Sequence, residues 1–188
     1  MTILTDREVS KFRDLYDKEE WAEIAEYGEE LLKKDPRDGM AIRFGVLDAY
    51  AVLGNSKGAE ELLTRYCDYA EDEDDEDPFH YRTAQEIWDT WTEEQRDTWQ
   101  SSLRPGYRYS LAMAYWKDGR EDEARQLIDS MPQYLDDYLG LDEEGLQQKR
   151  TEHRFRFKPG TVEELHMTIG VPYDDQIGFR NWIKGWRK

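Results

Sequence analysis

The chain has 188 residues, a net charge of −17 at pH 7 and an aromatic content of 13%. A disordered chain of such charge would lack these aromatic residues, so we expect a folded protein of one domain, or two small ones, with a strongly charged surface. Its single cysteine, Cys67, excludes a disulfide framework and a zinc site with several thiolate ligands within one chain.

The charge is unevenly distributed along the chain. Residues 1 to 100 carry a net charge of −16, whereas residues 149 to 188 carry +4. The acidic part repels nucleic acid, and the basic part can pair with an acidic partner or with the acidic body of the chain itself. The first residues show no signal-peptide pattern, and no apolar run approaches the ~20 residues that span a bilayer. We therefore expect a cytoplasmic protein without membrane association.

The first predicted element is a helical hairpin at about residues 5–35. Residues 5–8, with the sequence TDRE, form a capping box that begins a helix whose apolar face carries Val9, Phe12 and Tyr16. A second helix begins near Trp21 and ends before residues 35–36, because a proline disfavours the helical conformation of the residue that precedes it.

A second hairpin is predicted at 38–70, with its turn at residues 53–56. Apolar residues occupy two faces of its first helix, so this helix should be covered on two sides by neighbouring elements. Gly54 is a helix-ending residue, and Ser56 is suited to cap the second helix.

The predicted pattern weakens between residues 71 and 104. Seven consecutive carboxylates at 71–77 predict a solvated loop. A calcium site is the less favoured alternative, because the glycine and glutamate positions of an EF-hand hold Asp77 and Thr83. A poorly patterned third hairpin follows at about 78–104, with a capping box at 92–95. A fourth, better patterned hairpin is predicted at 106–132.

Residues 141–188 are predicted to form a C-terminal cap on the helical region 1–140. The basic-aromatic segment 151–158 alternates aromatic with basic or polar residues, and a capping box at 161–164 begins a helix that ends near Ile169. A last helix carries Phe179, Trp182, Ile183 and Trp186 on one face. Such a helix is expected to dock on the last hairpin, since an exposed repeat end leaves apolar surface in water.

Residues 42–63 and 107–128 align with matching residues at six positions and an offset of 65 residues. The matches are Arg43 with Arg108, Ala49 with Ala114, Tyr50 with Tyr115, Gly54 with Gly119, Ala59 with Ala124, and Leu62 with Leu127. The offset is close to two periods of ~34 residues, and the spacing of tyrosine, turn glycine and small residue resembles tetratricopeptide repeats. The resemblance implies an all-α, right-handed superhelix of antiparallel helix hairpins with a C-terminal helical cap.

A closer resemblance comes from the RDGxxxRF motif at 37–44, the turn at 53–54, the apolar positions at 59–66, the acidic gap and the segment 134–140. Together these resemble the helical-repeat region of the suppressor-of-tumorigenicity-7 family and of related bacterial repeat proteins. The resemblance implies a scaffold without an established catalytic role, and it adds no catalytic chemistry.

No motif in the sequence supplies a catalytic, cofactor or metal site. The three histidines, His80, His153 and His166, are too scattered for a spaced zinc motif, and phosphate-loop, nucleophile-elbow and dinucleotide-binding patterns are absent. We therefore expect a non-enzymatic protein that needs no cofactor. An enzyme built on an unrecognised all-α site is the third alternative.

The predicted function is the binding of a protein or peptide on the concave face of the repeat array. Exposed aromatic residues and methionine suit an apolar anchor of a partner, and arginine suits a carboxylate. The predicted partner-binding residues come from the first helices of the two aligned hairpins: Arg43, Phe44, Asp48, Arg108, Tyr109, Met113 and Trp116.

The leading alternative is an acidic mimic of nucleic acid that occupies the basic groove of a nucleic-acid enzyme. It requires carboxylates along one continuous face, whereas a scaffold scatters them over its solvent-exposed side. The basic-aromatic segment 151–158 suits either RNA or packing against an acidic face of the chain, and the acidic body makes nucleic acid the less favoured partner. The oligomeric state stays open.

Overall fold

The computed structural model describes residues 3–66, 91–97, 99–153 and 160–187, and every secondary-structure element in these ranges is helical. The prediction of an all-α chain is therefore confirmed for the described residues. Several predictions lie outside them: the acidic loop at 71–77, the first part of the hairpin at 78–104, and residues 154–158 of the basic-aromatic segment. Cys67 and His80 also lie outside the described residues.

The first hairpin consists of α1 (Asp6–Asp17) and α2 (Trp21–Lys34). The capping box is confirmed: the Glu8 amide donates to the Thr5 hydroxyl at 3.3 Å, and the Thr5 amide donates to the Glu8 carboxylate at 2.8 Å. Lys34 Nζ lies 2.6 Å from Glu8 Oε1, so the end of α2 is tied to the start of α1. As predicted, α2 ends directly before residues 35 and 36.

The pKa of Glu8 is lowered from 4.5 to about 2, first by the hydrogen bond from Lys34 and then by those from Thr5. A carboxylate with a lowered folded-state pKa stabilises the fold above its unfolded-state pKa, and this stabilisation is lost as the pH falls toward the folded-state value. We expect Glu8→Gln to be less stable than the wild type at neutral pH, and the difference to vanish between pH 4.5 and about pH 2.

Thermal unfolding midpoints measured across this pH range test the prediction. Glutamine at this position retains the capping-box geometry, so the comparison isolates the charge. Glu23→Gln, at an exposed position of α2, is the charge-matched control. If the unfolding midpoints of Glu8→Gln and the wild type differ at pH 2 by as much as at neutral pH, the stabilisation does not come from the lowered pKa of Glu8.

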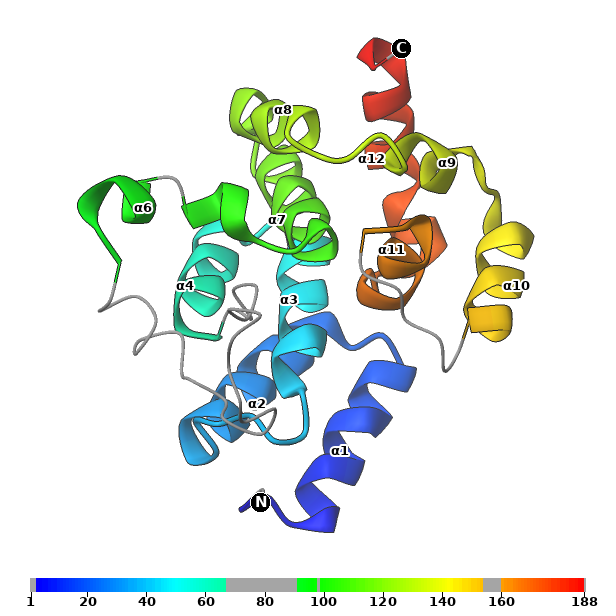
Figure 1. Cartoon of the computed structure of the whole chain (residues 1–188). Coiled ribbons are helices and arrows are strands. Elements are labelled where there is room, and N and C mark those ends of the chain that lie inside the picture. The colour runs from blue at the N-terminus through cyan, green and yellow to red at the C-terminus, as the bar shows by residue number, and fades with distance from the viewer. Residues whose placement is uncertain (1–2, 67–90, 98, 154–159, 188) are drawn as a thin grey trace.

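The central helix is α3 (Ile42–Leu53), which packs between α2 on one side and α7 (Pro105–Lys117) on the other (Figure 1). This confirms the prediction from its two apolar faces. Gly28 permits the close approach of α2, because a Cβ atom there would overlap the Val46 side chain. At the other end of α3, Gly54 takes the left-handed conformation with φ 69° and turns the chain into α4 (Ser56–Tyr66).

The two aligned hairpins, α3–α4 and α7 with α8 (Glu121–Asp129), pack directly on one another. In the described part of 78–104, the short helix α6 (Glu93–Asp97) and the 3-10 helix η1 (Trp99–Ser102) do not come between them; Gln100 of η1 donates to the Tyr115 hydroxyl at 2.7 Å. The capping box before α6 is confirmed by reciprocal hydrogen bonds between Thr92 and Gln95.

The repeat in the sequence corresponds to a repeat in the contacts. The Tyr50 hydroxyl of α3 donates to Glu29 of α2 at 3.0 Å, and the aligned Tyr115 hydroxyl of α7 donates to Glu60 of α4 at 2.6 Å. Arginine side chains neutralise both carboxylates: Arg65 reaches Glu29 at 2.7 Å and Arg120 reaches Glu60 at 3.0 Å. Burial and the neighbouring carboxylate raise the pKa of both tyrosines, so their hydroxyls stay protonated as donors.

The C-terminal part contains α9 (Leu135–Gly140), α10 (Glu143–His153), α11 (Val162–Thr168) and α12 (Tyr173–Trp186). The sequence pattern misses α10, because Leu146 is its only buried side chain among those described. The bounds of α11 agree with the prediction, but its capping box does not form: Glu164 accepts instead from the Gly160 amide at 3.0 Å and from the Tyr134 hydroxyl at 3.3 Å.

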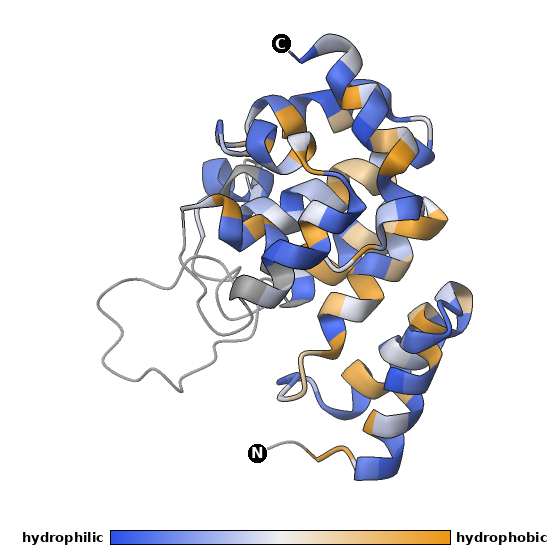
Figure 2. Ribbon diagram, turned by 90° about the vertical axis from the view of Figure 1, so that its right-hand side faces the viewer, coloured by the Kyte–Doolittle hydropathy of each residue, from blue (hydrophilic) through white to orange (hydrophobic). Residues whose placement is uncertain are grey.

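The described termini lie at opposite ends of the molecule, with α1 at one end and the end of α12 at the other (Figure 1). Polar and apolar residues alternate along the ribbons, as amphipathic helices require (Figure 2). The core runs through the middle of the molecule along α3 and α7, where Val46, Ala49, Tyr109 and Met113 have no exposed surface.

Candidate functional site: a groove between α1, α3 and residues 168–170

Four of the predicted binding residues lie on α7, and aromatic side chains of α12 pack against two of them, Tyr109 and Trp116. Tyr109 and Met113 are fully buried and Trp116 is half-buried. The Phe179 ring of α12 lies 5.3 Å from the Tyr109 ring and 5.5 Å from the Trp116 ring, and Trp182 extends the stack. The inner face of α7, which the sequence predicts as open, is therefore occupied by the chain itself.

A buried polar cluster fixes α12 on this face. Gln176 Oε1 accepts from the Tyr109 hydroxyl at 3.0 Å and from the Tyr138 hydroxyl at 3.1 Å, and its amide donates to the Val171 carbonyl at 2.6 Å. Burial raises the pKa of Tyr109 well above its usual value, which keeps its hydroxyl protonated. Every polar group of the Gln176 side chain thus has a specific partner, as tight packing of a buried amide requires.

Arg180 completes the attachment of α12. It is 2% exposed, and one guanidinium nitrogen donates to the carbonyls of Tyr138, Leu139 and Leu141 at 3.0, 3.1 and 2.6 Å. These carbonyls end α9, where the helix dipole favours a cation.

The two predicted arginines are held by the chain. Arg43 forms an ion pair with Asp38 at 2.9 Å, and Arg108 donates to the Ser130 carbonyl at 2.8 Å. Asp38 also accepts from the amides of Ile42 and Arg43 and so caps the start of α3. Burial raises the pKa of Asp38, and the Arg43 guanidinium opposes that rise. Arg43 and Arg108 therefore act as structural residues in this conformation.

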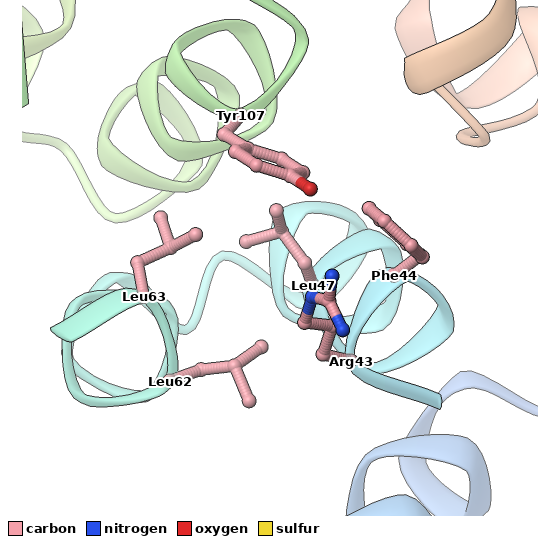
Figure 3. A pocket seen from close by; sticks show the side chains of 6 residues that line it. All are labelled: Arg43, Phe44, Leu47, Leu62, Leu63 and Tyr107. Atoms are coloured by element: carbon pink, nitrogen blue, oxygen red, sulfur yellow. The ribbon is translucent and has the colours of Figure 1, made fainter. Parts of the chain in front are cut away.

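A small apolar cavity beside α3 is also part of the packing. Its volume is about 10 Å³, no more than a single water molecule requires. Side chains from α3, α4 and α7 surround it (Figure 3), and the Phe44 ring stacks on the Tyr107 ring at 5.7 Å. The lining residues are Arg43, Phe44, Leu47, Leu62, Leu63 and Tyr107.

A depression larger than this cavity is a groove that Phe44 also lines. Its volume is about 320 Å³, within the range of roughly 300–1,000 Å³ typical of ligand sites. The helices α1 and α3 form two walls and residues 168–170 form the third. The lining residues are Phe12, Tyr16, Phe44, Gly45, Asp48, Thr168 and Gly170.

Two glycines shape this groove. At Gly45 a Cβ atom would lie 2.8 Å from the Phe12 ring and 3.2 Å from the Tyr16 ring, so glycine permits the close approach of α1. At Gly170 a Cβ atom would overlap the Asp48 carboxylate and lie 2.7 Å from the Tyr16 hydroxyl oxygen. Side chains at these positions would separate the walls from one another.

Tyr16 links all three walls. Its hydroxyl oxygen lies 2.8 Å from Asp48 Oδ2 and 3.1 Å from the Gly170 carbonyl oxygen, and both are acceptors for its proton. The Tyr16 ring packs edge-on against Trp21 at 5.6 Å, which fixes its orientation. Asp48 is 4% exposed, so its carboxylate lies at the base of the groove.

Of the seven predicted binding residues, only Phe44 and Asp48 lie in the groove. The sequence pattern did place Phe12 and Tyr16 on one face of the first helix, but the arrangement of α1 across Gly45 depends on tertiary packing. No signal in the sequence pointed to Thr168 or Gly170, which reach the groove from more than a hundred residues away.

Two further observations limit the chemistry of the described residues. No three His, Cys, Asp or Glu side chains among them are grouped so that they could hold a metal ion. No helix in the same ranges is long and apolar enough to cross a membrane.

Comparisons of the chain with models of protein families, with curated proteins and with solved structures found no match. The likeness to tetratricopeptide repeats and to the suppressor-of-tumorigenicity-7 family therefore rests on the sequence motifs alone and stays a prediction.

Proposed function

We propose that the chain is a non-enzymatic scaffold that binds a protein or peptide partner in the groove between α1, α3 and residues 168–170. The observation that carries this proposal is that the aligned faces of α3 and α7 differ, because α12 covers the face of α7 but not that of α3. Phe44 and Asp48 of α3 align with Tyr109 and Met113 of α7. The α7 face is covered by α12, whereas the α3 face borders a groove of about 320 Å³.

The covered face supports the proposal because it shows how such a face holds a chain segment. Phe179 of α12 packs into an aromatic surface, and Gln176 meets two tyrosine hydroxyls. A buried aromatic anchor combined with a few directed hydrogen bonds is typical of protein recognition sites. The repeated tyrosine–glutamate contacts favour a helical-repeat array of the tetratricopeptide type, and we expect it to act in the cytoplasm.

Selection of phage-displayed random peptides on the full chain tests this function. We expect selected peptides to shift the backbone amide resonances of Gly45, Thr168 and Gly170, because these residues line the groove. Phe44→Ala should weaken binding by about tenfold or more through the loss of an aromatic contact. Leu53→Ala, at a position of the same helix that is 49% exposed and outside the groove, is the matched control.

Peptides whose resonance shifts map away from the groove, or equal binding by both variants, would refute the proposal. Unfolding midpoints of the two variants must be compared, since Phe44 also stacks on Tyr107. The nucleic-acid mimic is the competing hypothesis. It predicts that a basic nucleic-acid enzyme binds the acidic surface and leaves the groove resonances unchanged.

A further inference from the structure

The hydroxyl groups in the groove donate their hydrogen bonds to acceptors of the chain itself. Tyr16 donates its proton toward Asp48 and the Gly170 carbonyl, and the Thr168 hydroxyl donates to the Glu164 carbonyl at 2.6 Å. Among the lining residues that the structure describes, both side-chain hydroxyl protons are therefore directed to the chain itself. A carboxylate has about four acceptor sites, and a carbonyl or hydroxyl oxygen has two lone pairs. The groove accordingly presents acceptors to an incoming group.

The charged and aromatic residues of the groove also favour an incoming group that is a cation. Among the lining residues that the structure describes, Asp48 is the only carboxylic acid, and lysine, arginine and histidine do not occur among these seven. The aromatic side chains of Phe12, Tyr16 and Phe44 form much of the remaining lining, and the faces of aromatic rings attract cations. The chain already makes such a contact nearby, where the Arg43 guanidinium lies 4.7 Å from the centre of the Phe44 ring.

We propose that the groove receives a lysine or arginine side chain of the partner protein, with its charged group at Asp48 and the Gly170 carbonyl and its aliphatic part against the aromatic lining. This inference rests on the proposed function and specifies the partner's chemistry. The charged groups of lysine and arginine carry several hydrogen-bond donors, and they complement a site that offers a largely buried carboxylate and further acceptors. The net charge of −17 steers basic partners toward the protein before they reach the groove.

The test uses acetylated, amidated tripeptides with a central residue between two glycines, titrated into the isotope-labelled full chain. The arginine and lysine peptides are expected to shift the Gly45 and Gly170 amide resonances in a saturable way. The peptides with neutral citrulline or norleucine in the central position should bind at least about tenfold more weakly, because they lack the charge. The arginine and lysine arms together show which cation the groove prefers.

Asp48→Asn should weaken binding of the arginine and lysine peptides by about tenfold or more. Asparagine has nearly the same shape as aspartate, and its side-chain oxygen still accepts the hydrogen bond from Tyr16. The comparison of charged with neutral peptides on the wild type tests the same inference without any variant. Asp129→Asn, at an exposed position of α8, removes the same charge away from the groove and should leave binding unchanged.

Equal effects of Asp48→Asn and Asp129→Asn, or shifts spread over exposed carboxylates, would overturn the inference in favour of general surface attraction. Selected peptides that bind in the groove without a basic residue would also overturn it, while leaving the proposed function intact. In a third outcome, free arginine amide competes with the tripeptides at the groove, but no selected peptide maps there. The groove would then be a site for a small cation, and both the proposed function and the inference of a protein partner would be refuted.

Discussion

Replacing Phe179 with alanine is expected to lower the free energy of unfolding by about 3–5 kcal/mol. Phe179 is fully buried and packs against Tyr109, Trp116 and Trp182 with ring-centre distances of 5.3, 5.5 and 5.6 Å. Truncation removes the apolar contacts and leaves a cavity that these rigid rings cannot fill by a small shift. Chemical denaturation of the full chain measures the change.

A matched control for this variant lies two residues earlier on the same helix. Ile177 is 41% exposed, so Ile177→Ala should change the free energy of unfolding by well under half as much. If the Phe179 and Ile177 variants lose equal stability, α12 does not depend on its aromatic anchor, and the description of the covered α7 face is wrong. A loss confined to Phe179→Ala supports it.

Replacing Gln176 with leucine is expected to lower the free energy of unfolding by about 2–4 kcal/mol. The substitution nearly preserves volume but removes the acceptor for the Tyr109 and Tyr138 hydroxyls and the donor for the Val171 carbonyl. A buried polar group without a partner costs about 1–3 kcal/mol, and the added apolar contact of leucine offsets part of the total. Chemical denaturation again supplies the measurement.

The control for this second variant is Gln126→Leu, at an exposed position of α8, where the change should stay within about 0.5 kcal/mol. A triple variant that also carries Tyr109→Phe and Tyr138→Phe should recover stability, because it removes the stranded hydroxyls together with their acceptor. Absence of any recovery would show that Gln176 acts through its shape and not through its hydrogen bonds.

The sequence predicted the helices that have strong local signals. The box at Thr5 and Glu8, the stop before Pro36 and the turn at Gly54 depend on residues within a few positions of each other, and the structure shows all three. The helix α10 was missed because a polar helix with one buried leucine has no apolar periodicity. Local sequence signals thus predicted where helices begin and end better than they predicted which elements pack against these helices.

The candidate site was predicted only in part, for a reason that Tyr109 illustrates. The sequence grouped Phe44 with Tyr109 by their alignment, but it could not show that Gln176 and Phe179 would contact the second residue and not the first. Arg43 and Arg180 likewise look like surface cations in the sequence. Their partners, the Asp38 carboxylate and the carbonyls that end α9, become apparent only when the helices are packed together.

The contact between Tyr16 and Gly170 joins residues 154 positions apart in the chain. During synthesis from the N-terminus, α1 and α3 leave the ribosome long before residue 170 is added, and domains begin to fold as they emerge. A nascent chain would therefore carry two walls of the groove without the third, and closing it requires a contact of high sequence separation. The partner binding proposed above would therefore require residue 170 to have left the ribosome, because a shorter nascent chain lacks the third wall of the groove.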